Sequence, residues 1–229
     1  MIKPSMKLVI LAAGKGTRMG ELTKDIPKPM LIVCGKNLIE HKLDATPMDQ
    51  ISEIVLVVGY LQEVIRTYFG SEYKGVPIIY VEDTIQGTGK AVWNAKEVLN
   101  EPFLVMMGDD IYHPDDIRMI MHTKGGILLD RVKKETKSGK VIIQNYVIVD
   151  IVEGGLLLPG EPINAAMYHL SPEIFAFDLI KTQDKDEWGL PQTLIARVQD
   201  YQLVPVYATR WIQITAPEDI EKAERDLGK

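Results

Sequence analysis

The chain alternates between short, unbroken apolar runs and longer segments in which apolar residues recur at helical spacing. The apolar runs of the first half occupy residues 7–12, 54–58, 76–81 and 103–107. Runs of this length without polar alternation are typical of strands buried on both faces of a parallel sheet. The helical segments occupy residues 38–43, 61–69 and 90–99. The first half therefore predicts a βαβαβαβ order and an α/β fold.

The pattern changes after about residue 130. Ser138 and Gly139 are followed by alternating residues as far as Asp150, which predicts a hairpin with one less buried face. A last helix is expected from near Thr215 to the end of the chain, with a capping box between Thr215 and Glu218. No clean linker interrupts the sequence, so we expect a single domain over residues 1–229.

Composition narrows the class of protein. The 229 residues are 46% apolar and 25% charged, as in ordinary globular proteins. The net charge of −6 leaves no basic surplus for a nucleic-acid backbone, so no nucleic-acid partner is expected. The apolar stretch at residues 8–13 is too short for a signal peptide or a membrane span, which favours a cytoplasmic protein with no membrane partner. The lone Cys34 excludes an internal disulfide, and we expect it to be a small buried residue. The sequence is compatible with a homo-oligomer and does not decide the oligomeric state.

A glycine-rich loop, LAAGKGTRM, follows the first predicted strand directly. Gly14 and Gly16 stand where backbone N–H groups can face an anion, and Arg18 adds positive charge. Downstream, the segment PKPM places Lys28 between two prolines that restrict the backbone and orient it. Together, these segments predict a phosphate-binding site.

The two common nucleotide motifs do not fit this chain. Met19 stands where the third glycine of GxGxxG would be, which argues against a dinucleotide-dependent oxidoreductase. The GTGK at residues 87–90 has Thr84 in place of the first Walker glycine and Ala91 in place of Ser or Thr. The phosphate loop is therefore of another kind.

Acidic residues follow the last of the four apolar runs. Asp109 and Asp110 lie at the carboxyl end of that strand, where open α/β sheets place their ligands. Asp115 and Asp116 come after a proline and before a helical run that begins at Ile117, so we expect them to cap that helix. No histidine is expected in the active site. The four histidines are interpreted as surface or locally bonded polar residues: His41, His113, His122 and His169.

The series LAAGKGTRM, PKPM, GTGKAV and GDD resembles the sugar-phosphate nucleotidylyltransferase family over nearly the whole chain. The resemblance implies a Rossmann-like fold with a mixed, mainly parallel sheet flanked by helices, and a reaction between an NTP and a sugar 1-phosphate with Mg²⁺. It implies that Arg18 and Lys28 contact the phosphates as catalytic groups, and that Glu82 or the neighbouring Asp83 lies near the base. The other nucleotide-binding residues that it implies are Leu11, Ala12, Ala13, Gly14, Lys15, Gly16, Gly87, Thr88 and Gly108.

The same resemblance implies a metal site at Asp109. Many members place a second metal-binding aspartate in a Trp-x-Asp segment before the last helix, where this chain has Gln213. We therefore expect Asp109 to be the main metal ligand and Gln213 to be the second, weaker one.

GTGKAV is most similar to the GTGHA of uridylyltransferases that act on N-acetylglucosamine 1-phosphate, which favours UTP. By this resemblance Gly139, Glu153 and Asn164 would face the sugar. Gly154 and Gly155 stand where many hexose 1-phosphate enzymes have Lys-Pro. A cytidylyltransferase for another phosphorylated alcohol and a non-catalytic nucleotide-sugar-binding subunit therefore remain alternatives. Acetyl transfer is not expected, because the sequence contains no hexapeptide repeats.

Overall fold

The four apolar runs of the first half form adjacent parallel strands in the middle of a ten-stranded sheet. They are β1 (Met6–Ala12), β4 (Ile51–Val58), β6 (Val76–Glu82) and β7 (Phe103–Met107). β1 pairs with β7 on one side and with β4 on the other, and β4 pairs with β6. The computed structural model describes residues 6–182 and 186–228. The mixed, mainly parallel sheet predicted for the fold class is confirmed around these strands.

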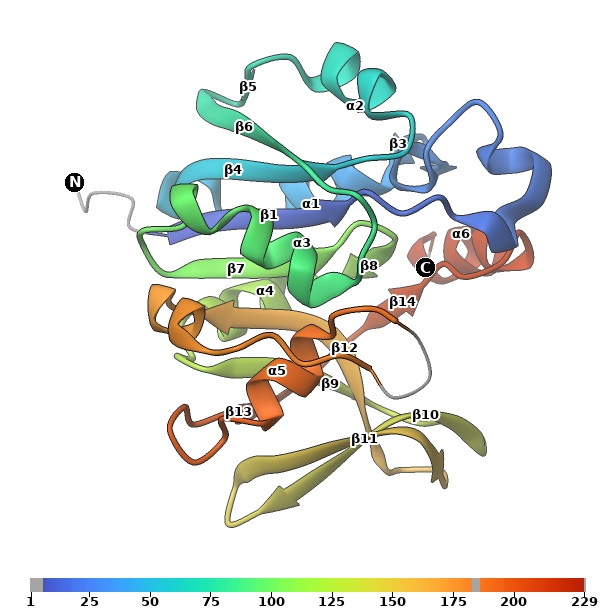
Figure 1. Cartoon of the computed structure of the whole chain (residues 1–229). Coiled ribbons are helices and arrows are strands. Elements are labelled where there is room, and N and C mark those ends of the chain that lie inside the picture. The colour runs from blue at the N-terminus through green and yellow to red at the C-terminus, as the bar shows by residue number, and fades with distance from the viewer. Residues whose placement is uncertain (1–5, 183–185, 229) are drawn as a thin grey trace.

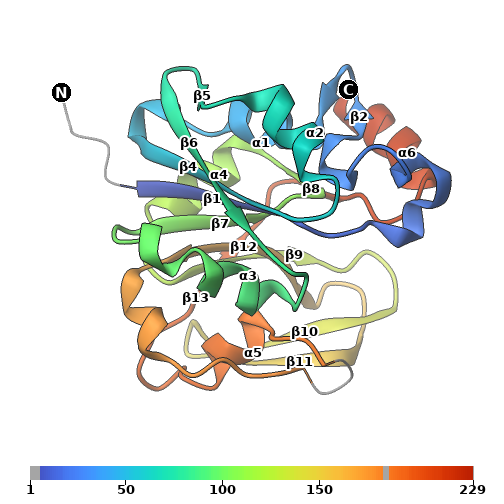
Figure 2. The same ribbon diagram turned by 45° about the horizontal axis from the view of Figure 1, so that its top comes forward.

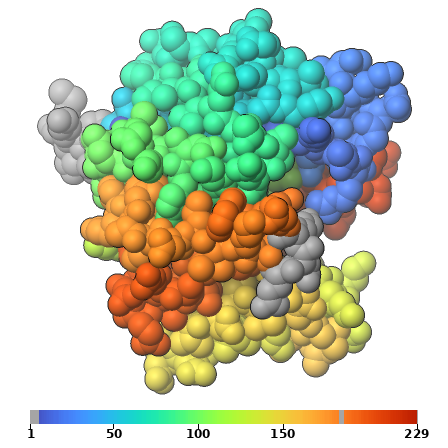
Figure 3. Space-filling model, in the orientation of Figure 1, coloured from blue at the N-terminus to red at the C-terminus, as the bar shows by residue number. Residues whose placement is uncertain are grey.

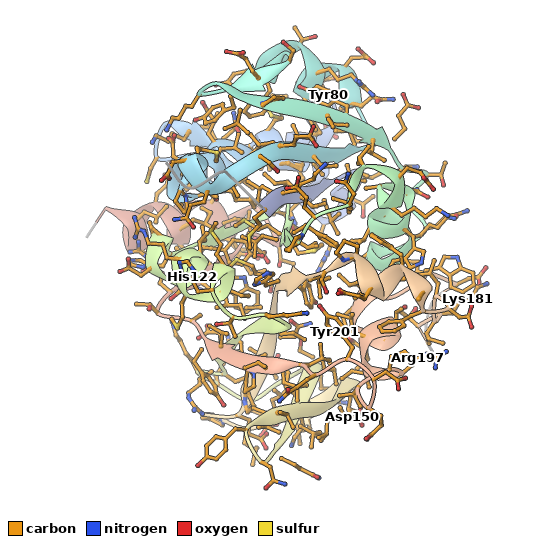
Figure 4. The ribbon with its side chains drawn as sticks, turned by 90° about the vertical axis from the view of Figure 1, so that its left-hand side faces the viewer. Tyr80, His122, Asp150, Lys181, Arg197 and Tyr201 are labelled. Carbon is orange, nitrogen blue, oxygen red and sulfur yellow. The ribbon has the colours of Figure 1, made fainter. Side chains whose placement is uncertain are left out.

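The second half of the chain extends the sheet with antiparallel strands. β12 (Pro162–Leu170) pairs antiparallel with β7. The hairpin of β10 (Thr136–Gln144) and β11 (Val147–Leu157) lies beyond it and confirms the predicted hairpin. β9 (Gly126–Arg131) pairs with β12 and with β13 (Val204–Tyr207). In Figure 4, Tyr80 on β6 and Asp150 on β11 lie near opposite ends of the molecule, so the sheet spans its whole height.

Helices cover both faces of the sheet (Figures 1 and 2). α1 (Leu38–Ala45), α2 (Gln62–Phe69) and α4 (Pro114–Met121) pack on one face, and α3 (Thr88–Asn94) and α5 (Leu190–Ile195) pack on the other. Along β1, Leu8 and Ile10 face the first group of helices, whereas Val9 and Leu11 face the second. Both faces of β1 are therefore buried, which explains why its sequence shows no polar alternation.

The helix predicted over residues 38–43 is confirmed by α1. α1 begins at an asparagine cap, because the Asn37 side chain accepts the N–H of Glu40 at 2.9 Å and the Glu40 carboxylate accepts the N–H of Asn37 at 2.9 Å. The predicted helix at residues 90–99 is only partly correct. α3 ends at Asn94, Ala95 has φ −90° and ψ 2°, and a separate 3₁₀ turn follows at Lys96–Val98.

The predicted caps of α4 are wrong. His113 is the N-cap, and its Nδ1 accepts the N–H of Asp115 at 3.3 Å. Asp116 is fully buried inside the first turn, where its carboxylate accepts the N–H groups of Thr209 at 2.8 Å and Arg210 at 3.1 Å. The tertiary partners at residues 209 and 210 override the local capping preference of this aspartate.

The predicted capping box of the last helix is also wrong. α6 (Glu218–Leu227) begins after Pro217, with no side chain bonded at its N-cap. Asp219, not Glu218, accepts the N–H groups of Thr215 at 2.8 Å and Ala216 at 3.0 Å. The carboxylate that satisfies these amides lies one residue later than the sequence motif indicates.

A third apolar cluster joins the two ends of the chain. α6 packs against β8 (Asp110–Tyr112), β14 (Trp211–Gln213) and the buried Met19 of the glycine loop. Figure 1 shows α6, in red, beside the blue N-terminal loop. Cys34 lies next to α6 but is exposed, with φ 48° in a tight turn, so its predicted burial is wrong.

Candidate active site

A cavity of about 280 Å³ lies at the carboxyl ends of β1 and β7, where open α/β sheets bind ligands. Its walls come from the glycine loop, the Pro-Lys-Pro segment, the start of α3 and the turn after β7. In Figure 3 the blue N-terminal loop, the green of α3 and the orange C-terminal segment come together at the front face. The lining residues are Leu11, Ala13, Gly14, Gly16, Thr17, Arg18, Lys28, Pro29, Asp83, Ile85, Gly87, Thr88, Ala91, Met107, Asp109 and Glu187.

The glycine loop turns at Gly16, whose φ of 63° lies in the left-handed region. A Cβ at this position would come within 2.8 Å of the Lys28 Cβ, so the close approach of the two segments also requires glycine. The Gly16 carbonyl accepts the Met19 N–H at 2.9 Å and the Thr23 hydroxyl at 3.1 Å. Because Met19 is buried, it anchors the loop, and Arg18 beside it lines the cavity.

Lys28 and Asp109 form an ion pair in the wall of the cavity. Lys28 Nζ lies 2.6 Å from Asp109 Oδ2, and the two side chains are 7% and 33% exposed. Lys28 lies in a 3₁₀ turn that begins after Pro27 and ends at Met30. The lysine is more deeply buried than a loop residue, and its ammonium group is held next to the carboxylate that the family resemblance gives to the metal.

The turn after β7 is tightly packed. The Gly108 N–H donates to the Leu11 carbonyl at 2.9 Å, and a Cβ at Gly108 would lie 2.6 Å from that carbonyl oxygen. Asp110 is 2% exposed; its Oδ2 accepts the Tyr112 hydroxyl at 3.3 Å, and its Oδ1 has no partner among the described residues. Burial, together with the charge of Asp109, raises the pKa of Asp110.

A segment from the far end of the chain packs against the start of α3. The Trp188 N–H donates to the Gln86 carbonyl at 2.7 Å, and the Trp188 carbonyl accepts the Gly89 N–H at 2.8 Å. The Thr88 hydroxyl accepts the Leu190 N–H at 3.1 Å. Gly87 has φ 101°, and a Cβ there would lie 2.4 Å from the Trp188 carbonyl oxygen. This contact fixes the GTG segment and also forms part of a second cavity.

The second cavity, of about 350 Å³, adjoins the first. The two share the lining residues Gly87, Thr88, Met107 and Glu187. The part that belongs to the second cavity alone is lined by Glu153, Asn164, Ala166, Tyr168, Thr182, Trp188, Gly189, Pro191 and Gln192.

Polar groups in the second cavity are held by hydrogen bonds. Glu153 Oε1 accepts the Gln192 side-chain amide at 3.1 Å. The Asn164 side chain donates to the Tyr168 hydroxyl at 2.7 Å and accepts the Ala166 N–H at 2.9 Å. Two of the three residues predicted to face a sugar, Glu153 and Asn164, therefore lie in one wall.

The third residue predicted to face a sugar, Gly139, lies behind Glu153, since a Cβ on Gly139 would lie 3.4 Å from Glu153 Oε1. Several other predicted site residues also lie outside the linings of the two cavities: Ala12, Lys15, Glu82, Gly108 and Gln213. Ala12 and Gly108 are packed behind the wall at the ends of β1 and β7. Glu82 points away and pairs with Arg66 at 3.4 Å.

Gln213 ends β14, where it is exposed and paired in register with Asp110. Sequence reasoning missed many residues of the walls, among them Thr17, Glu187 and Gln192. Thr17 lies inside the glycine motif and could have been included. Glu187 and Gln192 belong to no motif, and only the folded contact with α3 brings them to the cavities.

A family model described as nucleotidyl transferase matches residues 7–224. The chain belongs to the nucleotidyl transferase family. The resemblance to the sugar-phosphate nucleotidylyltransferases that its motifs predict is thereby confirmed, as is its being an enzyme of the transferase class.

Two curated relatives of this nucleotidyl transferase match nearly all of it. A UTP–glucose-1-phosphate uridylyltransferase, AglF, of Haloferax volcanii is 29% identical over 234 residues, which cover 97% of this chain and 96% of the relative. The bifunctional protein GlmU of Methanocaldococcus jannaschii is 30% identical over 226 residues, which cover 97% of this chain and 54% of the relative. The chain thus spans about half the length of the bifunctional relative.

Solved structures of low sequence identity share the fold. A CTP:phosphocholine cytidylyltransferase from Streptococcus pneumoniae has a TM-score of 0.75 at 21% identity, over 97% of this chain and 99% of its own. A UDP-glucose pyrophosphorylase complexed with UDP-glucose has a TM-score of 0.77 at 22% identity, over 100% of this chain and 99% of its own. None of the helices in residues 6–182 and 186–228 is long and apolar enough to cross a lipid bilayer.

Proposed function

We propose that this nucleotidyl transferase joins the nucleoside monophosphate of an NTP, with UTP preferred, to a sugar 1-phosphate and releases pyrophosphate. The observation that carries the proposal is the pair of adjoining cavities. One contains the phosphate-directed cations Arg18 and Lys28, and the other contains the polar side chains Glu153 and Asn164. Such an arrangement can hold two substrates with their reacting groups at the shared wall. We further propose that residues 1–229 act as one nucleotidyltransferase domain.

The proposed reaction is a direct displacement at the α-phosphorus of the NTP. A phosphate oxygen of the sugar 1-phosphate forms the new bond, while the bond from the α-phosphorus to the bridging oxygen of pyrophosphate breaks. Since a phosphomonoester has a second pKa of about 6, the attacking oxygen already carries negative charge near neutral pH. No general base is needed, in keeping with a cavity lining that contains no histidine among the described residues.

Charge repulsion is the main obstacle to bringing two phosphate groups together. Arg18 and Lys28 supply two positive charges in the wall of the first cavity. Both are placed to offset the charge that develops on the phosphoryl oxygens and on the departing pyrophosphate. Because Lys28 is almost fully buried, its charge acts at reduced solvent screening.

Mg²⁺ is the cofactor that we propose, and the residues present fit it. Asp109 offers a carboxylate that lines the cavity and is one-third exposed, and Mg²⁺ prefers such oxygen donors. Within residues 6–182 and 186–228 there is no group of three or more His, Cys, Asp or Glu residues that could hold a metal alone. Asp109 would therefore hold the metal together with the nucleotide phosphates, with Gln213 as a second oxygen donor. The metal would supply positive charge at the transferred phosphoryl group.

Support for UTP comes from the GTGKAV motif and from the relatives. AglF carries UTP and glucose 1-phosphate in its name. Gly154 and Gly155 after Glu153 replace the Lys-Pro of many hexose 1-phosphate enzymes, so the acceptor panel must extend beyond hexose phosphates.

The test is pyrophosphate release over a matrix of four NTPs and a panel of phosphorylated acceptors, with Mg²⁺ or with excess chelator. We expect the fastest release with UTP and a sugar 1-phosphate, and none with chelator. The Asp109→Asn variant serves as the control for contaminating activity. A preference for CTP with a non-sugar phosphate would replace the proposal with the cytidylyltransferase alternative. A matrix that is silent for the folded parent would overturn it.

A further inference from the structure

Lys42 is a fully buried lysine that the proposed reaction does not use. It lies on α1, is 1% exposed, and is the largest side chain in the described structure with so little exposure. Its ammonium group donates to the Leu38 carbonyl at 2.9 Å and to the Gly108 carbonyl at 3.0 Å. Burying an ammonium group is costly, and a buried lysine without a role is rare.

The second of these bonds reaches the turn that carries Asp109. The Gly108 N–H is held by the Leu11 carbonyl at 2.9 Å, and the Gly108 carbonyl is held by Lys42. Both polar groups of this residue are therefore fixed, one from the end of β1 and the other from α1. Asp109 follows directly, so its backbone position depends on both bonds.

Lys42 also lies near the ionisable groups behind the cavity wall. Burial lowers the pKa of Lys42 to about 8, and the nearby carboxylates of Asp110 and Asp109 oppose part of that shift. Asp110 is buried with one oxygen unpartnered among the described residues, and Lys28 is bonded to Asp109.

We propose that Lys42 is a positioning residue, which holds the Gly108–Asp109 turn, and with it the Asp109 carboxylate, in the geometry that accepts the metal–nucleotide complex. This inference rests on the proposed function for its metal, although not on the identity of the base or the acceptor. Lys42 lines neither cavity, so it acts through its bond to the Gly108 carbonyl.

The test must separate positioning from stability. Lys42→Met keeps most of the side-chain volume and removes the charge and both hydrogen bonds, but it also takes a positive charge away from the neighbourhood of the buried Asp110. Removing one partner of a buried pair destabilises a protein, whereas replacing both by neutral groups is often tolerated. The double variant Lys42→Met/Asp110→Asn therefore provides a folded background that lacks the Gly108 bond.

Lys7 offers a matched control at the opposite end of β1. It is also buried, and its ammonium group bonds the Val98 carbonyl at 2.6 Å and the Glu53 carboxylate. Lys7→Met should lower stability and leave nucleotide binding unchanged, because Lys7 lies far along the strand from the cavity. The single variant Asp110→Asn retains the bond from Lys42 to Gly108 and reports the effect of the carboxylate alone.

The experiment measures urea unfolding, calorimetric binding of UTP with and without Mg²⁺, and turnover for the parent and the four variants. We expect the double variant to unfold near the parental midpoint and to bind UTP without Mg²⁺ as the parent does. The gain in UTP affinity on adding Mg²⁺ and the turnover number should each fall about 10- to 100-fold, as when groups that orient a metal ligand are removed. In Asp110→Asn and Lys7→Met, which both keep the bond from Lys42 to the Gly108 carbonyl, the logarithm of each fold-loss should be less than a third of that in the double variant.

Parental Mg²⁺-dependent binding in the double variant, or an equal loss in Lys7→Met, would overturn the positioning role. Failure of the proposed function would be seen in the parent protein itself, not in a difference between the parent and the variants. If the parent binds a nucleotide with Mg²⁺ but transfers none, the binding measurement still decides the role of Lys42. If the parent binds none of the four NTPs, both proposals fall.

Discussion

Lys28 Nζ lies 2.6 Å from Asp109 Oδ2, although the two residues are 81 positions apart in the sequence. The pair joins the group that we assign to the nucleotide phosphates to the group that we assign to the metal. Each charge satisfies the other when no substrate is present. Binding of a metal–nucleotide complex would give the carboxylate a stronger cation and the ammonium group a phosphate, so the pair is preorganised for both tasks.

Substitution of the two cavity cations tests the phosphate assignment. We expect Arg18→Ala and Lys28→Ala each to reduce kcat by about two orders of magnitude or more, which corresponds to about 2.7 kcal/mol of transition-state stabilisation. Lys24→Ala is the control, since Lys24 belongs to the same loop region but is exposed and lines neither cavity. Steady-state pyrophosphate release, with circular dichroism to verify folding, gives the answer. Near-parental kcat in a folded Arg18 or Lys28 variant would refute the assigned role.

The metal site makes a prediction about Mg²⁺ dependence. Asp109→Asn should remove nearly all metal-dependent turnover, because the carboxylate is the one acidic metal ligand assigned to this chain. Gln213→Asp adds a negative charge beside Asp110 in the strand pair of β8 and β14, and should lower the Mg²⁺ concentration that gives half-maximal rate. A Mg²⁺ titration of turnover checks both variants. An Asp109→Asn curve that overlays the parent curve would contradict the site, and an unchanged Gln213→Asp curve would remove Gln213 alone.

Of the two acidic residues before α3, only Asp83 lines the first cavity, and we expect Asp83 to matter more than Glu82 for nucleotide binding. Asp83 lines the first cavity, and its carboxylate accepts the Ile85 N–H at 2.9 Å and the Asn94 side-chain amide at 2.8 Å. Asp83→Asn loses one of these bonds and should raise the KM for the NTP about tenfold, with a smaller change in kcat. Glu82→Gln should have a smaller effect, because Glu82 faces Arg66. A larger rise in KM for Glu82→Gln than for Asp83→Asn would instead assign the base-binding role to Glu82.

The contact between Gly87 and Trp188 predicts a stability effect that backbone strain alone does not explain. Gly87→Ala must accept φ 101° and a Cβ only 2.4 Å from the Trp188 carbonyl oxygen. We expect it to lower the free energy of unfolding by about 3 kcal/mol, from strain and overpacking together. Gly160→Ala is the control, since Gly160 has φ 91° but a Cβ there would meet no described atom within 4 Å. It should lose about 1 kcal/mol. Urea unfolding measures both, and equal losses would contradict the packing argument.

The sequence predicts the parallel centre of the sheet because its signal is local. The four strands β1, β4, β6 and β7 each contain a continuous apolar run, and burial on both faces needs no knowledge of the neighbours. The glycine loop and Lys28 are likewise predicted from adjacent residues. The caps at Asp116 and Asp219 are not, since their hydrogen-bond partners are set by tertiary contacts or by a shift of one residue.

The candidate site could be predicted only as far as its motifs extend. Glu187 and Gln192 carry no motif, and their place in the walls follows from the packing of their segment against α3. Lys42 did leave a signal. It stands on the buried side of α1 with Leu38 and Leu43, a position where the helical pattern calls for an apolar residue. A charged residue in an apolar stripe is a reason to look for a buried partner.

The backbone bonds between Trp188 and the GTG segment have a consequence for synthesis on the ribosome. The motifs LAAGKGTRM, PKPM, GTGKAV and GDD have all been translated by residue 110, yet the wall around Gly87 cannot close until the chain has passed residue 190. Until residues 167–170 are made, β7 lacks its antiparallel partner on one edge. A nascent chain that stalls in this interval would carry all the motifs and no finished pocket, and it would present an open apolar edge of the kind that recruits other chains.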